Sequence, residues 1–219
     1  MSLFQQIKKL MVGGAEHHAS PLSFDDLLFL DAILDSKNVD VVEARGYLQK
    51  GLHRLLKSEL EPALACFTKL VKTASSHKNK AFALFYRGII LTRLELWGEA
   101  IADFDLVSEL SPELSQLYLN RGICFHQLGK EEEALEDFNR VIESLDSGPE
   151  LASAYYNRSA VYETLGNTEG ALGDIEQAIK SHPEFDLFHI EKARLKQRLE
   201  QTRQKRRTRP SLLQIPSFS

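Results

Sequence analysis

Cysteine, methionine and tryptophan are scarce in this chain, which has two, two and one of them among 219 residues. With only Cys66 and Cys124, a disulfide framework and a four-cysteine zinc site are excluded by number. No run of about 18 apolar residues is present, as a hydrophobic membrane span would require. The N-terminal stretch is too short and too polar for a secretory signal. These absences favour a reducing compartment, and we expect a cytoplasmic protein.

Catalytic motifs are missing as well. The sequence has no glycine-rich phosphate loop, no H-E-x-x-H, no G-x-S-x-G and no paired cysteine motif. His17 and His18 precede Asp25, but adjacent histidines between small residues are weak evidence for a metal. We therefore predict a protein that is not an enzyme, with no catalytic residue, metal or cofactor.

The composition, 43% hydrophobic and 26% charged, is that of a globular protein. The net charge of −4 conceals an uneven distribution. Residues 191–209 hold nine Lys and Arg against two Glu, so the rest of the chain has a net charge of about −11. An acidic body therefore precedes a basic segment.

A repeat dominates the sequence between these ends. Four segments each contain two amphipathic helical patterns, and their shared alanines, spaced by 37, 34 and 37 residues, are Ala63, Ala100, Ala134 and Ala171. A Gly or Ser in the first helix and an Ala in the second allow close backbone approach, and a large ring fills the remaining space. The pattern predicts an all-α protein built from helical hairpins.

Particular residues of this repeat carry a family resemblance. Asn120-Arg121-Gly122 and Asn157-Arg158-Ser159 in the first helices, with Gly129 and Gly166 in the turns, resemble the tetratricopeptide repeat (TPR) family. The resemblance implies an all-α superhelix, a solenoid of about four helix-turn-helix repeats with N- and C-terminal capping helices. The expected divisions are an N-terminal segment 1–36 with a short capping helix, repeats within 37–184 (about 43–79, 80–113, 114–150 and 151–184), a basic capping helix 185–206 and a flexible tail 207–219. In the capping helix, Leu187, Ile190, Leu195 and Leu199 are expected to cover the fourth repeat.

The resemblance also implies where a partner binds, because the first helices of such repeats line a concave groove. The solvent-facing groove positions are predicted to be Phe82, Phe85, Tyr86, Gln116, Asn120, Ile123, His126, Ser153, Tyr156, Asn157 and Glu163. Asn120 and Asn157 are the favoured contacts, since an Asn side chain can pair with the backbone of an extended peptide. Two alternatives stay open: the Asn residues bridge neighbouring repeats, and Phe82 and Phe85 pack against the first repeat.

Family members that bind chaperone C-termini clamp a carboxylate with paired cations. The corresponding positions here are Arg45 with Gln49, Phe82 with Tyr86, Gln116 with Asn120 and Ser153 with Asn157, so the paired cations are missing. Binding to the Hsp70 or Hsp90 C-terminus is therefore disfavoured. Separately, Arg87, Arg121 and Arg158 each precede an Asp by sixteen positions, which predicts an ion pair across each hairpin.

The predicted function is that of a non-catalytic adaptor or scaffold, co-chaperone-like, that binds a partner peptide or helix in its groove. A second interpretation is an assembly factor targeted to nucleic acid or an anionic membrane by its basic tail, Arg203, Lys205, Arg206, Arg207 and Arg209. A solvated helix extension is the simpler account of that tail. The expected assembly is a monomer or a weak homo-oligomer.

Overall fold

The computed structural model describes residues 39–74 and 76–208, and all regular secondary structure within these ranges is α-helical. The expected N-terminal capping helix in segment 1–36, as well as Arg209 and the tail that follows it, lie outside the described residues. The chain divides into two compact units, residues 1–120 and 121–219.

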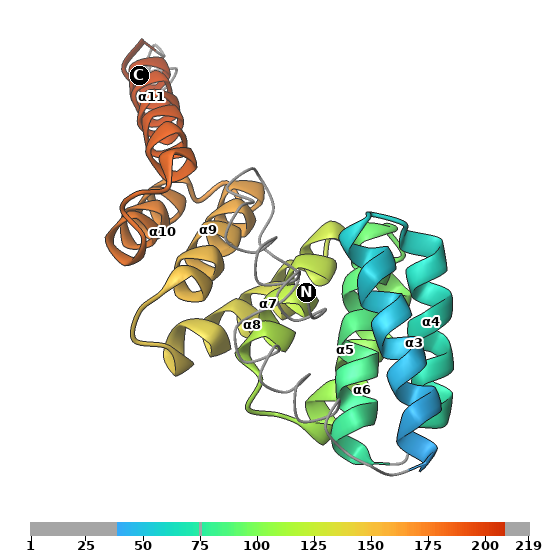
Figure 1. The fold of residues 1–219 in the computed structure, drawn as a ribbon. Helices are drawn as coiled ribbons and strands as arrows, with labels where there is room; N and C mark the ends of the chain where they lie inside the picture. Colours follow the sequence, from blue (N-terminus) through green and yellow to red (C-terminus); the bar gives the residue numbers. More distant parts are fainter. Residues whose placement is uncertain (1–38, 75, 209–219) are drawn as a thin grey trace, which may run out of the picture. The chain divides into compact units, whose positions relative to one another are not determined.

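Each unit is a stack of helices in which consecutive helices pack on one another (Figure 1). The described helices of the first unit are α3 (Val39–Leu56), α4 (Leu60–Thr73), α5 (His77–Arg93) and α6 (Trp97–Leu110). The division between the units falls within α7 (Ser115–Gln127). The second unit continues with α8 (Glu131–Ser144), α9 (Pro149–Thr164), α10 (Thr168–Ser181) and α11 (Asp186–Thr208).

The turn inside each hairpin has the same backbone conformation. One residue, always five positions before the repeated alanine, has a positive φ: 58° at Ser58, 60° at Glu95, 71° at Gly129 and 76° at Gly166. Only glycine adopts this left-handed region without steric cost. The first two repeats therefore contain strained turns that the last two avoid.

Close packing within the hairpins explains the small residues. The four repeated alanines are fully buried. A Cβ atom added at Gly51, Gly88 or Gly122 would approach the facing phenylalanine ring to 2.9, 2.6 or 2.8 Å, closer than van der Waals contact allows. The rings belong to Phe67, Phe104 and Phe138. The glycine is thus required by the ring opposite it, and the fourth repeat, with Ser159 at this position, has Ile175 in place of the phenylalanine.

Candidate partner-binding surfaces

The predicted Arg–Asp pairs are confirmed in all three hairpins. Arg87 binds Asp103 through two hydrogen bonds of 2.6 Å, and Arg121–Asp137 and Arg158–Asp174 have the same two-bond geometry at 2.7–2.8 Å. The aspartates are buried, and these hydrogen bonds raise the guanidinium pKa of Arg87 and of Arg158. The pairs join the two helices of a hairpin, which is a structural role.

The first repeat has no equivalent pair, because Lys50 and Cys66 stand where the other repeats have Arg and Asp. Cys66 is half-buried, and its Cβ would lie 3.2 Å from a Cβ added at Gly51. The position therefore takes part in close packing between α3 and α4. The Arg–Asp pair across the hairpin therefore begins at the second repeat, and the first hairpin has instead an Arg54–Glu59 ion pair at its turn.

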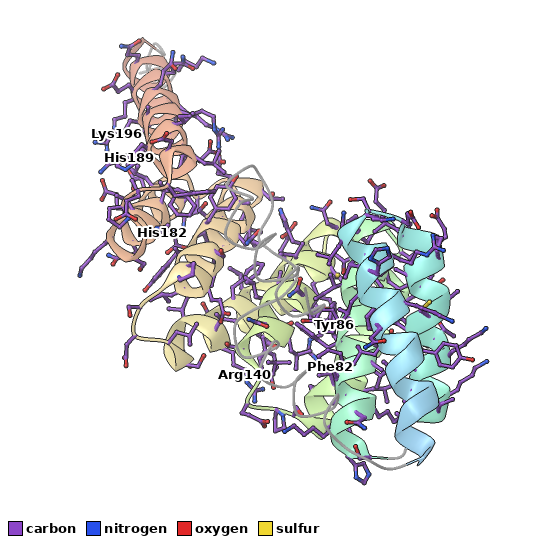
Figure 2. The ribbon with its side chains drawn as sticks, viewed as in Figure 1. Phe82, Tyr86, Arg140, His182, His189 and Lys196 are labelled. Atoms are coloured by element: carbon purple, nitrogen blue, oxygen red, sulfur yellow. The ribbon has the colours of Figure 1, made fainter. Side chains whose placement is uncertain are left out.

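The prediction that three aromatic side chains of the second repeat face solvent in the groove is wrong. Phe82, Phe85 and Tyr86 are all buried; it is Tyr86 that stacks on a ring of the first repeat, while Phe85 packs on Tyr86 and on Phe104 of its own repeat. Tyr86 stacks on Phe67 of α4 at 5.7 Å and contacts Phe82 at 4.6 Å between ring centroids. Phe82 and Tyr86 lie one helical turn apart on α5 (Figure 2). Burial of such large apolar rings stabilises the first unit more than their exposure in a groove would.

The two favoured asparagines share one geometry. Asn120 Nδ2 donates to the Gln116 carbonyl, and Asn157 Nδ2 donates to the Ser153 carbonyl, each at 2.8 Å. Both side chains are half-buried. The amide nitrogen is thus engaged within its own helix and not with a neighbouring repeat, contrary to the bridging alternative. The bond holds the side chain in one orientation and leaves the Oδ1 atom as an oriented acceptor.

The other polar groove positions are also held by local bonds. His126 Nδ1 lies 2.6 Å from Glu131 Oε2 at the start of α8, and Ser153 Oγ donates to the Pro149 carbonyl at 2.8 Å. Gln116 and Ile123 are half-buried on α7. The His126 and Ser153 side chains are thus oriented before any partner arrives, which lowers the entropy cost of binding.

Tyr156 and Glu163 of α9 contact the C-terminal helix, which the sequence did not predict. The Tyr156 ring packs on Phe188 of α11 with centroids 5.5 Å apart, and burial, followed by the charge of Glu191, raises the pKa of Tyr156. Glu163 accepts from Arg198 at 2.6 Å and also from Arg194. These two residues therefore help to anchor α11.

The face by which α11 packs differs in part from the predicted one. Leu195 is fully buried against Ala171 and Ile175, and Leu199 is half-buried, as expected. Leu187 and Ile190 are instead 39% and 64% exposed, and their predicted role in covering the fourth repeat is wrong. Phe188, which the sequence analysis missed, takes that role with Ala152 and Ala178. Its signal was the seven-residue spacing from Leu195, which places both on one helix face.

Some cations of the basic segment form ion pairs that anchor α11 on α10. Lys192 Nζ lies 2.9 Å from Glu176 Oε1, and Arg203 binds Glu169 at 3.3 Å, both on α10. Lys205 is exposed, and Arg206 and Arg207 fall within the last turns of α11. His189 and Lys196 project from α11 as exposed side chains (Figure 2). The described cations thus include both docking groups and solvent-exposed ones.

The residues that the structure describes contain no cluster of three His, Cys, Asp or Glu side chains suited to a metal ion. None of the described helices is long and apolar enough to cross a membrane.

Comparison with known proteins identifies the repeat. The tetratricopeptide repeat model matches residues 115–144 and 152–185. Over 112 residues, the chain is 27% identical to the human mitochondrial import receptor subunit TOM70; the match covers 50% of this chain and 18% of that protein. The chain thus spans less than a fifth of the length of this relative.

Solved structures share the fold. YrrB, described as a TPR protein with an unusual peptide-binding site, superposes with a TM-score of 0.60 at 23% identity, covering 87% of both chains. The first TPR of Spaghetti (RPAP3), bound to the HSP90 peptide SRMEEVD, gives a TM-score of 0.51 at 25% identity, covering 55% of this chain and 94% of that one. The fold is therefore an all-α superhelical solenoid of helix-turn-helix repeats.

Proposed function

Because the chain belongs to the tetratricopeptide repeat family, we propose that it is a non-catalytic adaptor that binds a segment of a partner protein on the first helices of its repeats. The relatives support protein binding as the general role: TOM70 is named as an import receptor subunit, and the RPAP3 domain holds a peptide. The proposal places the protein in a reducing compartment such as the cytoplasm, since Cys66 and Cys124 form no disulfide.

The oriented asparagines are the observation that carries this proposal. Asn120 and Asn157 occupy equivalent positions of successive repeats, and neither contributes to the hydrophobic cores. Each presents an Oδ1 acceptor whose direction is set by the bond from Nδ2 to the preceding helical turn. An acceptor that recurs at one repeat position suits the N–H groups of an extended backbone. Because Asn120 and Asn157 are half-buried, less water competes for such a hydrogen bond, and the bond contributes more to the binding free energy.

The chemistry of the partner differs from that of a chaperone tail. The SRMEEVD peptide is the ligand of RPAP3. In the present chain Gln116 and Ser153 stand where a carboxylate clamp needs cations, and Ser153 donates to its own helix. The proposed partner is therefore bound through an internal segment and not through a terminal carboxylate.

Affinity capture of the full chain, followed by mass spectrometry, tests this function. We compare the wild type with the double variant Asn120→Ala, Asn157→Ala, and with Gln177→Ala, which removes an exposed amide from the second helix α10. Loss of two hydrogen bonds should weaken capture roughly tenfold or more, while Gln177→Ala should have no effect. Circular dichroism verifies that each variant retains its helices. A partner set that is the same for all three proteins would contradict the assignment of the asparagines.

The exposed end of α11 favours a second candidate function, recruitment to nucleic acid or an anionic membrane. Arg203 binds Glu169, and α11 continues past it with Lys205, whose side chain is exposed. This function requires binding to RNA or anionic vesicles that weakens with salt and disappears when residues 201–219 are deleted. Salt-independent binding, or no binding, would rule it out.

A further inference from the structure

One side of α11 carries an exposed stripe that is distinct from its packed face. The packed face consists of Phe188 and Leu195. The stripe consists of Leu187, Ile190, Arg194 and Arg198, whose spacing of three and four residues aligns them along one side of the helix. Leu187 and Ile190 are 39% and 64% exposed, and the arginine side chains are 46% and 49% exposed. We refer to these four residues as the α11 stripe.

The register of the repeat relates this stripe to the groove positions. Pro183 follows Pro149 by 34 residues, the length of one repeat, so α11 stands where the first helix of a fifth repeat would begin. In this register Leu187 and Ile190 correspond to Ser153 and Tyr156 of α9. The contacts of Glu163 with Arg194 and Arg198 show that this side of α11 borders α9. The stripe therefore extends the first-helix surface of the second unit.

The arginines of the stripe share a carboxylate. Glu163 accepts from both Arg194 and Arg198, and Arg194 also binds Glu191. A guanidinium group has five N–H donors, and Arg198 uses only Nη1 in its described contact. Both arginines thus keep donors for a second carboxylate, and Glu163 is the internal anion with which that carboxylate competes.

We propose that the α11 stripe binds an acidic segment of a partner protein, with an apolar side chain of that segment on Leu187 and Ile190 and its carboxylates on Arg194 and Arg198. This inference rests on the proposed adaptor function and specifies the partner's chemistry. The apolar pair distinguishes such a segment from a nucleic acid, whose phosphate backbone has nothing to bury against Leu and Ile. The cations distinguish it from a basic peptide.

Fluorescence anisotropy with the full chain tests the stripe. The probe is a short labelled peptide with two leucines among aspartates, blocked at both ends so that it has no terminal carboxylate. The comparison probes are the same peptide with lysines in place of aspartates, and a single-stranded RNA of similar length. We expect binding of the aspartate peptide only, weakening as salt is added. Preferential binding of the lysine peptide or of the RNA, or no binding of the aspartate peptide, would overturn the proposal.

Two variants of one ion pair make the test specific. Arg198→Gln and Glu163→Gln both remove the Arg198–Glu163 ion pair, and Glu163→Gln also removes the ion pair with Arg194, so any loosening of α11 is at least as large in Glu163→Gln. The proposal predicts opposite effects on binding: Arg198→Gln weakens it about fivefold, and Glu163→Gln strengthens it because the competing carboxylate is gone. Effects of the same sign would refute the proposal.

The apolar half of the stripe has its own variant. Ile190→Asp should weaken binding about fivefold or more, and Leu106→Asp, at a leucine of α6 that is 44% exposed, should leave it unchanged. Equal effects of the two substitutions would contradict a specific site. If Ile190→Asp leaves peptide binding unchanged while capture of cellular partners still depends on the asparagines, the proposal for the α11 stripe is wrong and the adaptor function stands.

Discussion

Gly122→Ala is the substitution whose effect follows most directly from the packing. The new Cβ would lie 2.8 Å from Cε1 and 3.1 Å from Cδ1 and Cζ of Phe138. Phe138 is fully buried, so its ring has no free space to move into. Overpacking of this kind costs about 1–3 kcal/mol, whereas replacing a helical Gly with Ala contributes about 1 kcal/mol of stability.

Gly173→Ala is the matched control for the helix-propensity gain. Gly173 is exposed within α10, and a Cβ added there meets nothing within 4 Å. Both variants gain the same helix propensity, so the difference between their free energies of unfolding isolates the overpacking cost. Gly173→Ala should be more stable than Gly122→Ala by about 1–3 kcal/mol. Urea unfolding followed by circular dichroism at 222 nm measures this difference. If Gly122→Ala were as stable as Gly173→Ala, the argument that the ring requires the glycine would be refuted.

A double substitution tests the same reasoning by rescue. The fourth repeat combines Ser159 with Ile175, and transferring this pair to the third repeat as Gly122→Ser with Phe138→Ile removes the clashing ring atoms. The double variant should be more stable than the sum of the two single effects predicts, by about 1 kcal/mol. Strict additivity would show that the two positions do not interact.

The other predictions concern turns and ion pairs. Glu95→Gly should raise the free energy of unfolding by about 1 kcal/mol, and with it the urea midpoint, because glycine adopts the positive φ without steric cost. Asp137→Asn leaves the charge of Arg121 without its carboxylate and should lower stability by about 3 kcal/mol in the same assay. The bond to Lys192 lowers the pKa of Glu176, so its stabilisation is present above the ordinary Glu pKa of about 4.3 and is lost as pH falls through the lower folded value. The melting-temperature difference between wild type and Glu176→Gln should therefore vanish in acid; a difference that persists would contradict this pair.

Features set by the repeat register could be predicted from the sequence. The Arg–Asp pairs followed from a constant spacing of sixteen residues, because two helices joined by a fixed turn bring those positions together in every hairpin. The buried alanines followed in the same way. Both depend on contacts within one hairpin, which the local sequence determines.

Features that depend on competition between neighbouring residues could not be predicted. The groove positions of α5 hold rings, and the gain from packing Tyr86 on Phe67 overrides the outward position that the repeat assigns. In α11 two apolar stripes, one through Leu187 and Ile190 and one through Phe188 and Leu195, allow two rotations of the helix about its axis. The fit of Phe188 and Leu195 into the fourth repeat selects one, and periodicity alone does not rank them.

The surface used for partner binding is the central claim, and hydrogen–deuterium exchange of the full chain with a captured partner measures it most directly. We predict that the partner slows exchange in the first helices, including residues 153–163 of α9 and 187–198 of α11, while the exposed faces of α8 and α10 are unchanged. Protection confined to α8 and α10 would contradict the account.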